Sequence, residues 1–216
     1  MTKKPWENDL FNDRQDAALH LAKRLQSYQG KNPLILAIPR GAVPMGKTIA
    51  RELDGDFDVV LVRKLRAPHQ PELALGAVNE SGETYLADFA ELYDASDAHL
   101  KQEIQIQLAT IRKRRAQYAN IKPSVSPSGR IVIVVDDGLA TGATMISALQ
   151  GLRLRKPAKL ICAVPVAPAD TLLKIKGFAD EVVCLETPHF FQAVGQFYRH
   201  FPQIEDDEVL RLLQDA

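Results

Sequence analysis

Residues 131–144 limit the possible folds more than any other part of the chain. They read IVIVVDDGLATGAT, which is five apolar residues, two aspartates, and then small or hydroxyl-bearing residues. The apolar run predicts a buried strand, and the residues after it predict a loop that leads into a helix. Asp136 and Asp137 should then lie at the carboxyl end of a central strand, where open α/β sheets bind ligands.

The same alternation of apolar strands with helices runs through most of the chain. Strands are predicted at 34–38, 58–62, 131–135, 159–164 and 181–185, and helices at 13–28, 44–53, 144–155 and 168–176. Strands without polar positions that alternate with helices are typical of parallel strands buried on both faces. The sequence therefore predicts an α/β fold with a doubly wound, mainly parallel sheet.

The segment after the second strand departs from this alternation. Residues 63–72, RKLRAPHQPE, contain two prolines and several charges without a period, so we expect an exposed, mobile loop there. Residues 75–79 and 83–87, split by a Ser-Gly pair, predict a hairpin. A long helix is predicted after Ser96, a candidate cap. Its apolar face comprises Leu100, Ile104, Leu108 and Ile111.

Composition limits the class of protein. The chain has 216 residues, 27 basic and 27 acidic, and 46% are hydrophobic. These values fit one ordinary domain and give no net field that would hold the protein on nucleic acid or an anionic membrane. The start, MTKKPWENDLF, has no signal-like apolar run, and no segment approaches the ~18 apolar residues of a membrane span. We expect a cytoplasmic protein whose Cys162 and Cys184 are reduced, buried thiols.

The loop after the strand at 131–135 has the chemistry of a phosphate site. Its small side chains let backbone N–H groups close around an anion, and the helix after the loop adds a favourable dipole. Thr141 and Thr144 can donate hydroxyl hydrogen bonds. Paired acids can also simply end a strand and cap the next turn of the chain, but that role does not require the complete DDxxxTGxT pattern. We therefore predict a polyhydroxylated, phosphorylated ligand.

A second phosphate-binding pattern competes with the first. Residues 41–48, GAVPMGKT, match the P-loop pattern GxxxxGK[ST], and Asp136 could act as a Walker B acid. Two features count against this interpretation. Pro44 removes a backbone donor from a loop that has to cradle phosphate, and a P-loop would leave the TGAT loop without a role.

Residues 131–144 resemble the PRPP-binding motif of type I phosphoribosyltransferases, where PRPP is 5-phosphoribosyl pyrophosphate. The order of elements over about 34–185 is similar to that of the family. The resemblance is closest to a poorly characterised bacterial branch with three further motifs. These are PRG at 39–41, RKL..P..PELALGAV.E at 63–80 and F..VG..Y..F at 191–201.

The resemblance implies a type I phosphoribosyltransferase fold with a small hood and a mobile lid or hairpin. We expect a single domain over 1–216, with its core at about 31–186 and its hood formed by 1–30 and 187–216. Dimers are common in the resembling family, so a homodimer is compatible with the sequence.

By this resemblance each part of PRPP has its own residues. The ribose 2- and 3-hydroxyls are held by Asp136 and Asp137, which are catalytic together with Arg63 and Lys64. The 5-phosphate is bound by Ala140, Thr141, Gly142, Ala143 and Thr144. Pyrophosphate is bound by Arg40, Gly41, Ala42, Arg63 and Lys64. The lid carries Arg66 and His69.

The implied reaction needs positive charge near the leaving group. Displacement of pyrophosphate from the anomeric carbon passes through an oxocarbenium-like state, as in other sugar transfers. The expected cofactor is Mg²⁺, bound through PRPP with no direct protein ligand expected. A lid over 64–72 would exclude water from the activated sugar.

The acceptor is the part of the reaction that the sequence describes least. Candidate base-binding residues are Val166, Phe190 and Phe191, and Tyr198 could also stack on a ring. However, Phe191, Val194 and Tyr198 fall at helical spacing, and on pattern alone a core role is favoured.

The predicted function is transfer of 5-phosphoribosyl from PRPP to a nitrogenous base, a purine or pyrimidine, with release of pyrophosphate, as in nucleotide salvage. The partners would be PRPP and a small-molecule base, without nucleic acid or membrane. A non-catalytic PRPP-binding regulator is the main alternative, but neutral charge and the lack of a recognisable DNA-binding extension count against it. A P-loop nucleoside-triphosphatase comes third. Simpler roles stay open for Arg63 and Lys64 as a solvated strand end, for His69 as an ordinary loop residue, and for 112–115 as a basic helix end.

Overall fold

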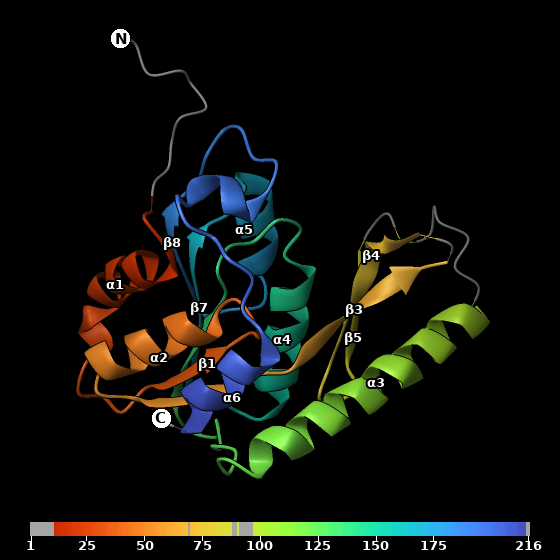
Figure 1. Ribbon diagram of the computed structural model, residues 1–216, viewed down its shortest axis with the longest axis horizontal. Helices are drawn as coiled ribbons and strands as arrows, with labels where there is room; N and C mark the ends of the chain where they lie inside the picture. Colours follow the sequence, from red (N-terminus) through yellow and green to blue (C-terminus); the bar gives the residue numbers. More distant parts are fainter. Residues whose placement is uncertain (1–10, 69, 88–89, 91–96, 215–216) are drawn as a thin grey trace.

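The centre of the molecule is a five-stranded parallel sheet (Figure 1). The computed structural model describes residues 11–68, 70–87, 90 and 97–214. The strand order is β2-β1-β6-β7-β8, and every neighbouring pair runs parallel. The strands are β1 (Leu34–Ala37), β2 (Asp56–Val59), β6 (Ile131–Val135), β7 (Lys159–Val166) and β8 (Glu181–Glu186). The predicted mainly parallel sheet is therefore confirmed.

Helices cover both faces of this sheet. They are α1 (Arg14–Arg24), α2 (Val43–Glu52), α4 (Ala143–Leu154), α5 (Ala169–Ile175) and α6 (Asp206–Gln214), whereas α3 (Asp97–Ala119) lies against the smaller sheet described below. On one face, Ile35 and Ile133 share a core cluster with α1, α2 and α6. On the other face, Leu36 and Val134 pack with α4 and α5. Because alternate residues of a strand face opposite sides, a strand without polar positions suits a sheet that is wound on both faces.

A smaller antiparallel sheet lies beside the parallel one. It has the order β3-β4-β5 and consists of β3 (Val62–Ala67), β4 (Gln70–Asn79) and β5 (Thr84–Leu86). The predicted hairpin at 75–79 and 83–87 is confirmed by β4 and β5. Helix α3 packs on β3 and β4, and together they project to one side of the molecule (Figure 1). Ser96, the predicted cap of α3, lies outside the described residues.

The expectation of a loop over 63–72 is wrong for the described residues of that stretch. Residues 63–67 continue β3, and 70–72 begin β4, with register irregularities near Arg66 and Ala67. Leu65 and Ala67 are buried and alternate with exposed Lys64 and Arg66, which is the period of a half-buried strand. Pro68 lies in the turn between the strands, where it interrupts no ladder.

Two further comparisons with the predictions concern the cysteines and the segments assigned to the hood. Cys162 is buried and Cys184 half-buried, both as free thiols; Cys184 belongs to β8, the last strand in the order of the parallel sheet. Phe11 forms a parallel bridge with Tyr198, so the N-terminal and C-terminal segments touch. Within the described part of the chain, no helix is long and apolar enough to cross a membrane.

Candidate active site

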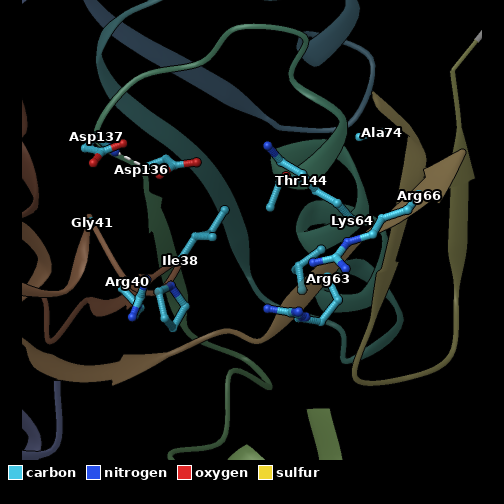
Figure 2. Close-up of a pocket in the computed structure, with 12 residues that line it drawn as sticks. Ile38, Arg40, Gly41, Arg63, Lys64, Arg66, Ala74, Asp136, Asp137 and Thr144 are labelled. Atoms are coloured by element: carbon cyan, nitrogen blue, oxygen red, sulfur yellow. Dashed lines mark hydrogen bonds between the residues drawn. The ribbon is translucent and has the colours of Figure 1, made fainter. Parts of the chain in front are cut away.

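A cavity of about 420 Å³ lies where the carboxyl ends of β1 and β6 face the β3–β4 hairpin (Figure 2). Its lining comes from both sheets and from the first turn of α4. The lining residues are Ile38, Pro39, Arg40, Gly41, Val62, Arg63, Lys64, Arg66, Ala74, Asp136, Asp137 and Thr144. The structure thus brings together most of the residues that the sequence assigns to ribose, pyrophosphate and lid.

Asp136 and Asp137 directly follow β6, and we call them the carboxylate pair. The Asp137 amide donates to Asp136 Oδ1 at 2.9 Å, and Asp136 points into the cavity (Figure 2). Burial and the negative charge of Asp137 hold the pKa of Asp136 well above its ordinary value, while Lys64 and Arg14 oppose this shift. Burial also raises the pKa of Asp137, again opposed by Arg14. The pair is therefore an electrostatically costly arrangement.

Arg14 is a part of this site that the sequence predictions missed. Its Nε and Nη2 each lie 2.9 Å from Asp137 Oδ2. Its Nη1 donates to the Pro202 carbonyl at 2.7 Å, and its guanidinium lies 3.7 Å from the centroid of the Phe201 ring. One sequence signal could have revealed it. Arg14 lies three, four and seven residues before Ala17, Ala18 and Leu21, and so on the same buried face of α1. An unpaired cation on that face would be costly.

Gly41 and Tyr198 enclose Asp137 further. A Cβ atom at Gly41 would lie only 2.0 Å from Asp137 Oδ2 and 3.3 Å from Arg14 Nη2. The Tyr198 hydroxyl donates to the Asp137 carbonyl at 2.6 Å. The peptide between Pro39 and Arg40, directly before Gly41, is cis. Asp137 is thus held by contacts from separate parts of the chain.

The loop between β6 and α4 provides backbone donors. Gly142, with φ of 77°, is the cap residue of α4 and has no side chain to cap the helix; the Ala143 N–H has only a long hydrogen bond, of 3.5 Å, to Thr141 Oγ1. Ala140 and Thr141 are exposed, and Thr144 lines the cavity. The first N–H groups of a helix have no partner within it, so an anion can accept hydrogen bonds from the start of α4. Thr171 fixes the loop by donating to the Ala140 carbonyl at 2.6 Å.

Four basic residues, Arg40, Arg63, Lys64 and Arg66, form what we call the basic cluster. The last three come from β3 and lie across the cavity from the carboxylate pair (Figure 2). Arg63 Nε donates to Gln107 Oε1 of α3 at 2.9 Å. Burial, with Arg114 and Arg66 nearby, lowers the pKa of Arg63, so an anion in the cavity would relieve repulsion among these cations.

Arg40 has acidic partners that the sequence predictions also missed. Its Nη1 lies 3.3 Å from Glu205 Oε2 and 3.7 Å from Asp206 Oδ1, at the start of α6. Arg114 lies 3.4 Å from the same oxygen of Asp206. Side chains far apart in the sequence therefore meet in one network of charges at the edge of the cavity.

The remaining predicted site residues lie elsewhere. Ala42 is buried at the start of α2, and His69 lies outside the described residues. Val166 is fully buried, whereas the Phe190 side chain is exposed. Phe191 packs on Phe197, with ring centroids 5.3 Å apart. The three base-binding candidates are thus outside the set of side chains that lines the cavity.

The P-loop interpretation of residues 41–48 is wrong, because 43–48 are part of helix α2 and do not form a loop. Gly46 packs tightly against Ala37 and Phe57 in the core. Lys47 donates to the Leu212 carbonyl at 3.2 Å, and Thr48 to Gln15 Oε1 at 2.7 Å. These contacts direct the motif's polar groups to α6 and α1.

Comparisons with known proteins agree with this geometry. Residues 12–199 match the family model described as the phosphoribosyl transferase domain. The chain is 43% identical over 208 residues to "Putative phosphoribosyl transferase MT0597" of Mycobacterium tuberculosis strain CDC 1551 / Oshkosh, and equally to its counterpart Rv0571c in strain H37Rv. Each match covers 96% of this chain and 47% of the relative, so the chain spans about half the length of these relatives.

A solved structure shares the fold over nearly its whole length. The crystal structure of TT1426 from Thermus thermophilus is similar with a TM-score of 0.80 and 41% sequence identity, over 95% of this chain and 98% of that chain. The family match over 12–199 and the relatives named as putative phosphoribosyl transferases confirm the family resemblance that was based on residues 131–144. The chain belongs to the phosphoribosyl transferase domain family, that of the type I phosphoribosyltransferases.

Proposed function

We propose that this chain transfers the 5-phosphoribosyl group of PRPP to a nitrogenous base, a purine or pyrimidine, and releases pyrophosphate. The observation that carries the proposal is that one cavity brings together paired carboxylates, the first turn of helix α4 and a cluster of cations. These three features match the hydroxyls, the phosphate and the pyrophosphate of the donor. The reaction would belong to nucleotide salvage in the cytoplasm.

The sugar end of PRPP would lie against the loop between β6 and α4. Asp136 and Asp137 would accept hydrogen bonds from the ribose 2- and 3-hydroxyls. Backbone N–H groups over 140–144, with the hydroxyls of Thr141 and Thr144, would bind the 5-phosphate at the start of α4. Such contacts are with fixed backbone groups, which orient the anomeric carbon without ordering long side chains.

The pyrophosphate end would lie against the basic cluster and the backbone at Gly41 and Ala42. Arg40, Arg63 and Lys64 would stabilise the negative charge that develops on the leaving group. The carboxylate pair would suit the positive charge that develops on the ribose ring. Charge of both signs is therefore available where the transition state requires it.

A magnesium ion fits this donor set. Among the described residues, no three His, Cys, Asp or Glu side chains gather as a metal site. Mg²⁺ commonly keeps several waters and is held largely by substrate phosphates, so it would be bound through PRPP, without a direct ligand from the protein. When bound through PRPP, Mg²⁺ would neutralise charge on the pyrophosphate.

The β3–β4 hairpin, with Arg66 near its tip, is the proposed lid, and His69 stays a proposed lid residue although it lies outside the described residues. Closure over the cavity would exclude water, which would otherwise hydrolyse the activated sugar. The hood would come from 1–30 and 187–216 around a core at about 31–186, in one domain. We retain Val166, Phe190 and Phe191 as proposed base-binding positions, which would require this region to rearrange when substrate binds.

One experiment tests the function. The protein is incubated with PRPP, Mg²⁺ and a panel of purines and pyrimidines, and pyrophosphate release is followed alongside nucleotide formation. We expect release that depends on one class of base. PRPP binding without release for any base would favour the regulator, and failure to bind PRPP would overturn both.

A further inference from the structure

Arg14 is a buried cation at the site that lies outside the DDxxxTGxT motif, and the motif gives it no role. The residue is only 8% exposed, although it is the first residue of α1. It contacts the side chain of Asp137, the carbonyl of Pro202 and the ring of Phe201. A buried guanidinium with three kinds of partner is held in a single orientation.

The contact with Asp137 is directional. Both Nε and Nη2 of Arg14 point to the same oxygen, Oδ2, at 2.9 Å. Gly41 closes the space next to that oxygen. The Asp137 carboxylate therefore has one oxygen committed to Arg14, and its orientation is fixed by neighbours on two sides.

The contact also balances charge. The groups that face Asp137 are Arg14 from α1, Asp136 from the end of β6 and the Tyr198 hydroxyl, while Lys64 of β3 faces Asp136. Burial raises the pKa of both aspartates, and Arg14 is the cation in direct contact with Asp137. Without it, protonation of one carboxyl would relieve the repulsion between neighbouring charges.

We propose that Arg14 is a positioning residue of the ribose site, which orients the Asp137 carboxylate so that Oδ1 faces the sugar. The inference rests on the proposed function, because it assumes that Asp137 binds ribose. A competing role is structural: Arg14 could serve only to fasten α1 to Pro202 and Phe201. The two roles differ in whether the effect of Arg14 passes through Asp137.

A double-mutant cycle separates these roles. The affinity for PRPP with Mg²⁺ is measured by calorimetry for the wild type, Arg14→Gln, Asp137→Asn and the double variant. We expect Arg14→Gln to weaken binding about tenfold, or ~1.4 kcal/mol, and to have little further effect once Asp137 is Asn. The matched control is Arg24→Gln, at the exposed end of the same helix, which should bind as the wild type does.

The pH dependence provides a readout that a structural role would not change. Loss of Arg14 should raise the pKa of Asp137 further, so binding by Arg14→Gln should recover towards the wild type as the pH rises. Titration of PRPP itself affects both proteins and cancels in the ratio of their affinities. Arg14→Lys keeps the charge and should restore part of the affinity, which also covers a failure of the Gln variant to fold.

The outcomes are distinguishable. A wild type that does not bind PRPP overturns the proposed function. A wild type that binds, with an Arg14→Gln variant of equal affinity, overturns the role of Arg14 alone. Additive effects of Arg14→Gln and Asp137→Asn, with an affinity ratio independent of pH, also overturn it in favour of the structural role.

Discussion

The two sides of the cavity are built in different ways. Asp137, in the carboxylate pair, is half-buried and held by Arg14 and Tyr198, and the backbone at Gly41 approaches its carboxylate too closely to leave room for a Cβ atom. Arg40, in the basic cluster, is held by Glu205 and Asp206, whose side chains are 67% and 55% exposed. One side is fixed by packing, and the other by ion pairs that solvent can reach.

This difference indicates how the donor would be bound. The fixed side presents acceptors in place, so a bound ribose would gain its hydrogen bonds without reorganisation of the protein. On the other side, pyrophosphate would have to replace acidic partners of Arg40, and exposed ion pairs are worth only about 0–1 kcal/mol. We therefore expect large effects from changes on the carboxylate side and small ones from changes to the partners of the basic cluster.

The largest effect is expected from Asp136→Asn with Asp137→Asn. The double change removes both charged acceptors of the ribose hydroxyls, each worth about 1.5–3 kcal/mol. The affinity for PRPP should fall more than about 100-fold in calorimetry. Binding that stays within a few fold of the wild type would show that the sugar is held elsewhere.

Asp136→Asn alone tests whether the loss of PRPP affinity in the double variant could come from unfolding of the protein. The raised pKa of Asp136 means that its ionised form destabilises the folded state at neutral pH. The Asn variant should therefore have a higher Tm than the wild type at about pH 7. By the same sign, the wild type without ligand should become more stable as the pH falls through the raised pKa of Asp136.

The next largest effect is expected from Gly41→Ala. The new Cβ would lie 2.0 Å from Asp137 Oδ2, so the carboxylate or its partner Arg14 has to move. We expect a stability loss of about 1–3 kcal/mol and a clear loss of PRPP affinity. In Gly177→Ala the Cβ would meet only an atom at 3.6 Å, so this control should retain both. An unchanged affinity in Gly41→Ala would mean that the orientation of Asp137 is unimportant.

A smaller effect, of opposite sign, is expected from Glu205→Gln with Asp206→Asn. Releasing Arg40 from these acids should increase PRPP affinity by up to about fivefold, and the gain should shrink as salt is added. The matched control is Asp207→Asn, which removes a charge from the same turn of α6 without touching an ion pair of Arg40. Weaker binding in the double variant would show that the acids support the site.

The sequence predicted the parts of the site that are encoded locally. Residues 131–144 carry the strand, the acids, the loop and the helix start within one short segment, and each element follows from periodicity and small side chains. Arg14 could not be found in this way, because its partner Asp137 lies 123 residues further along the chain. The charge of Arg14 on an apolar helix face was the available signal.

The β3 strand was missed for a related reason. Two prolines and a high density of charge are typical of loops, but pairing with β4 and burial of Leu65 on α3 depend on distant residues. Local patterns also produced a false match at 41–48. Most of the residues that match the P-loop pattern lie within helix α2. Gly46 is needed there because a larger side chain would collide with Phe57, and not because the backbone has to approach a phosphate.

The smallest effect on PRPP affinity is therefore expected from Lys47→Ala, although Lys47 is the cation that the false P-loop match would require. Its Nζ donates to the Leu212 carbonyl near the end of α6, so its loss should cost about 0.5–1.5 kcal/mol and lower the Tm by a few degrees, roughly 2–4 °C per kcal/mol. PRPP affinity should stay within about twofold of the wild type, since Lys47 is not among the residues that line the cavity. Calorimetry and thermal unfolding on one sample separate these quantities. A large loss of PRPP affinity with an unchanged Tm would show that residues 41–48 bind phosphate. The two sides of the cavity would then not be the donor site, and the comparison between them would lose its basis.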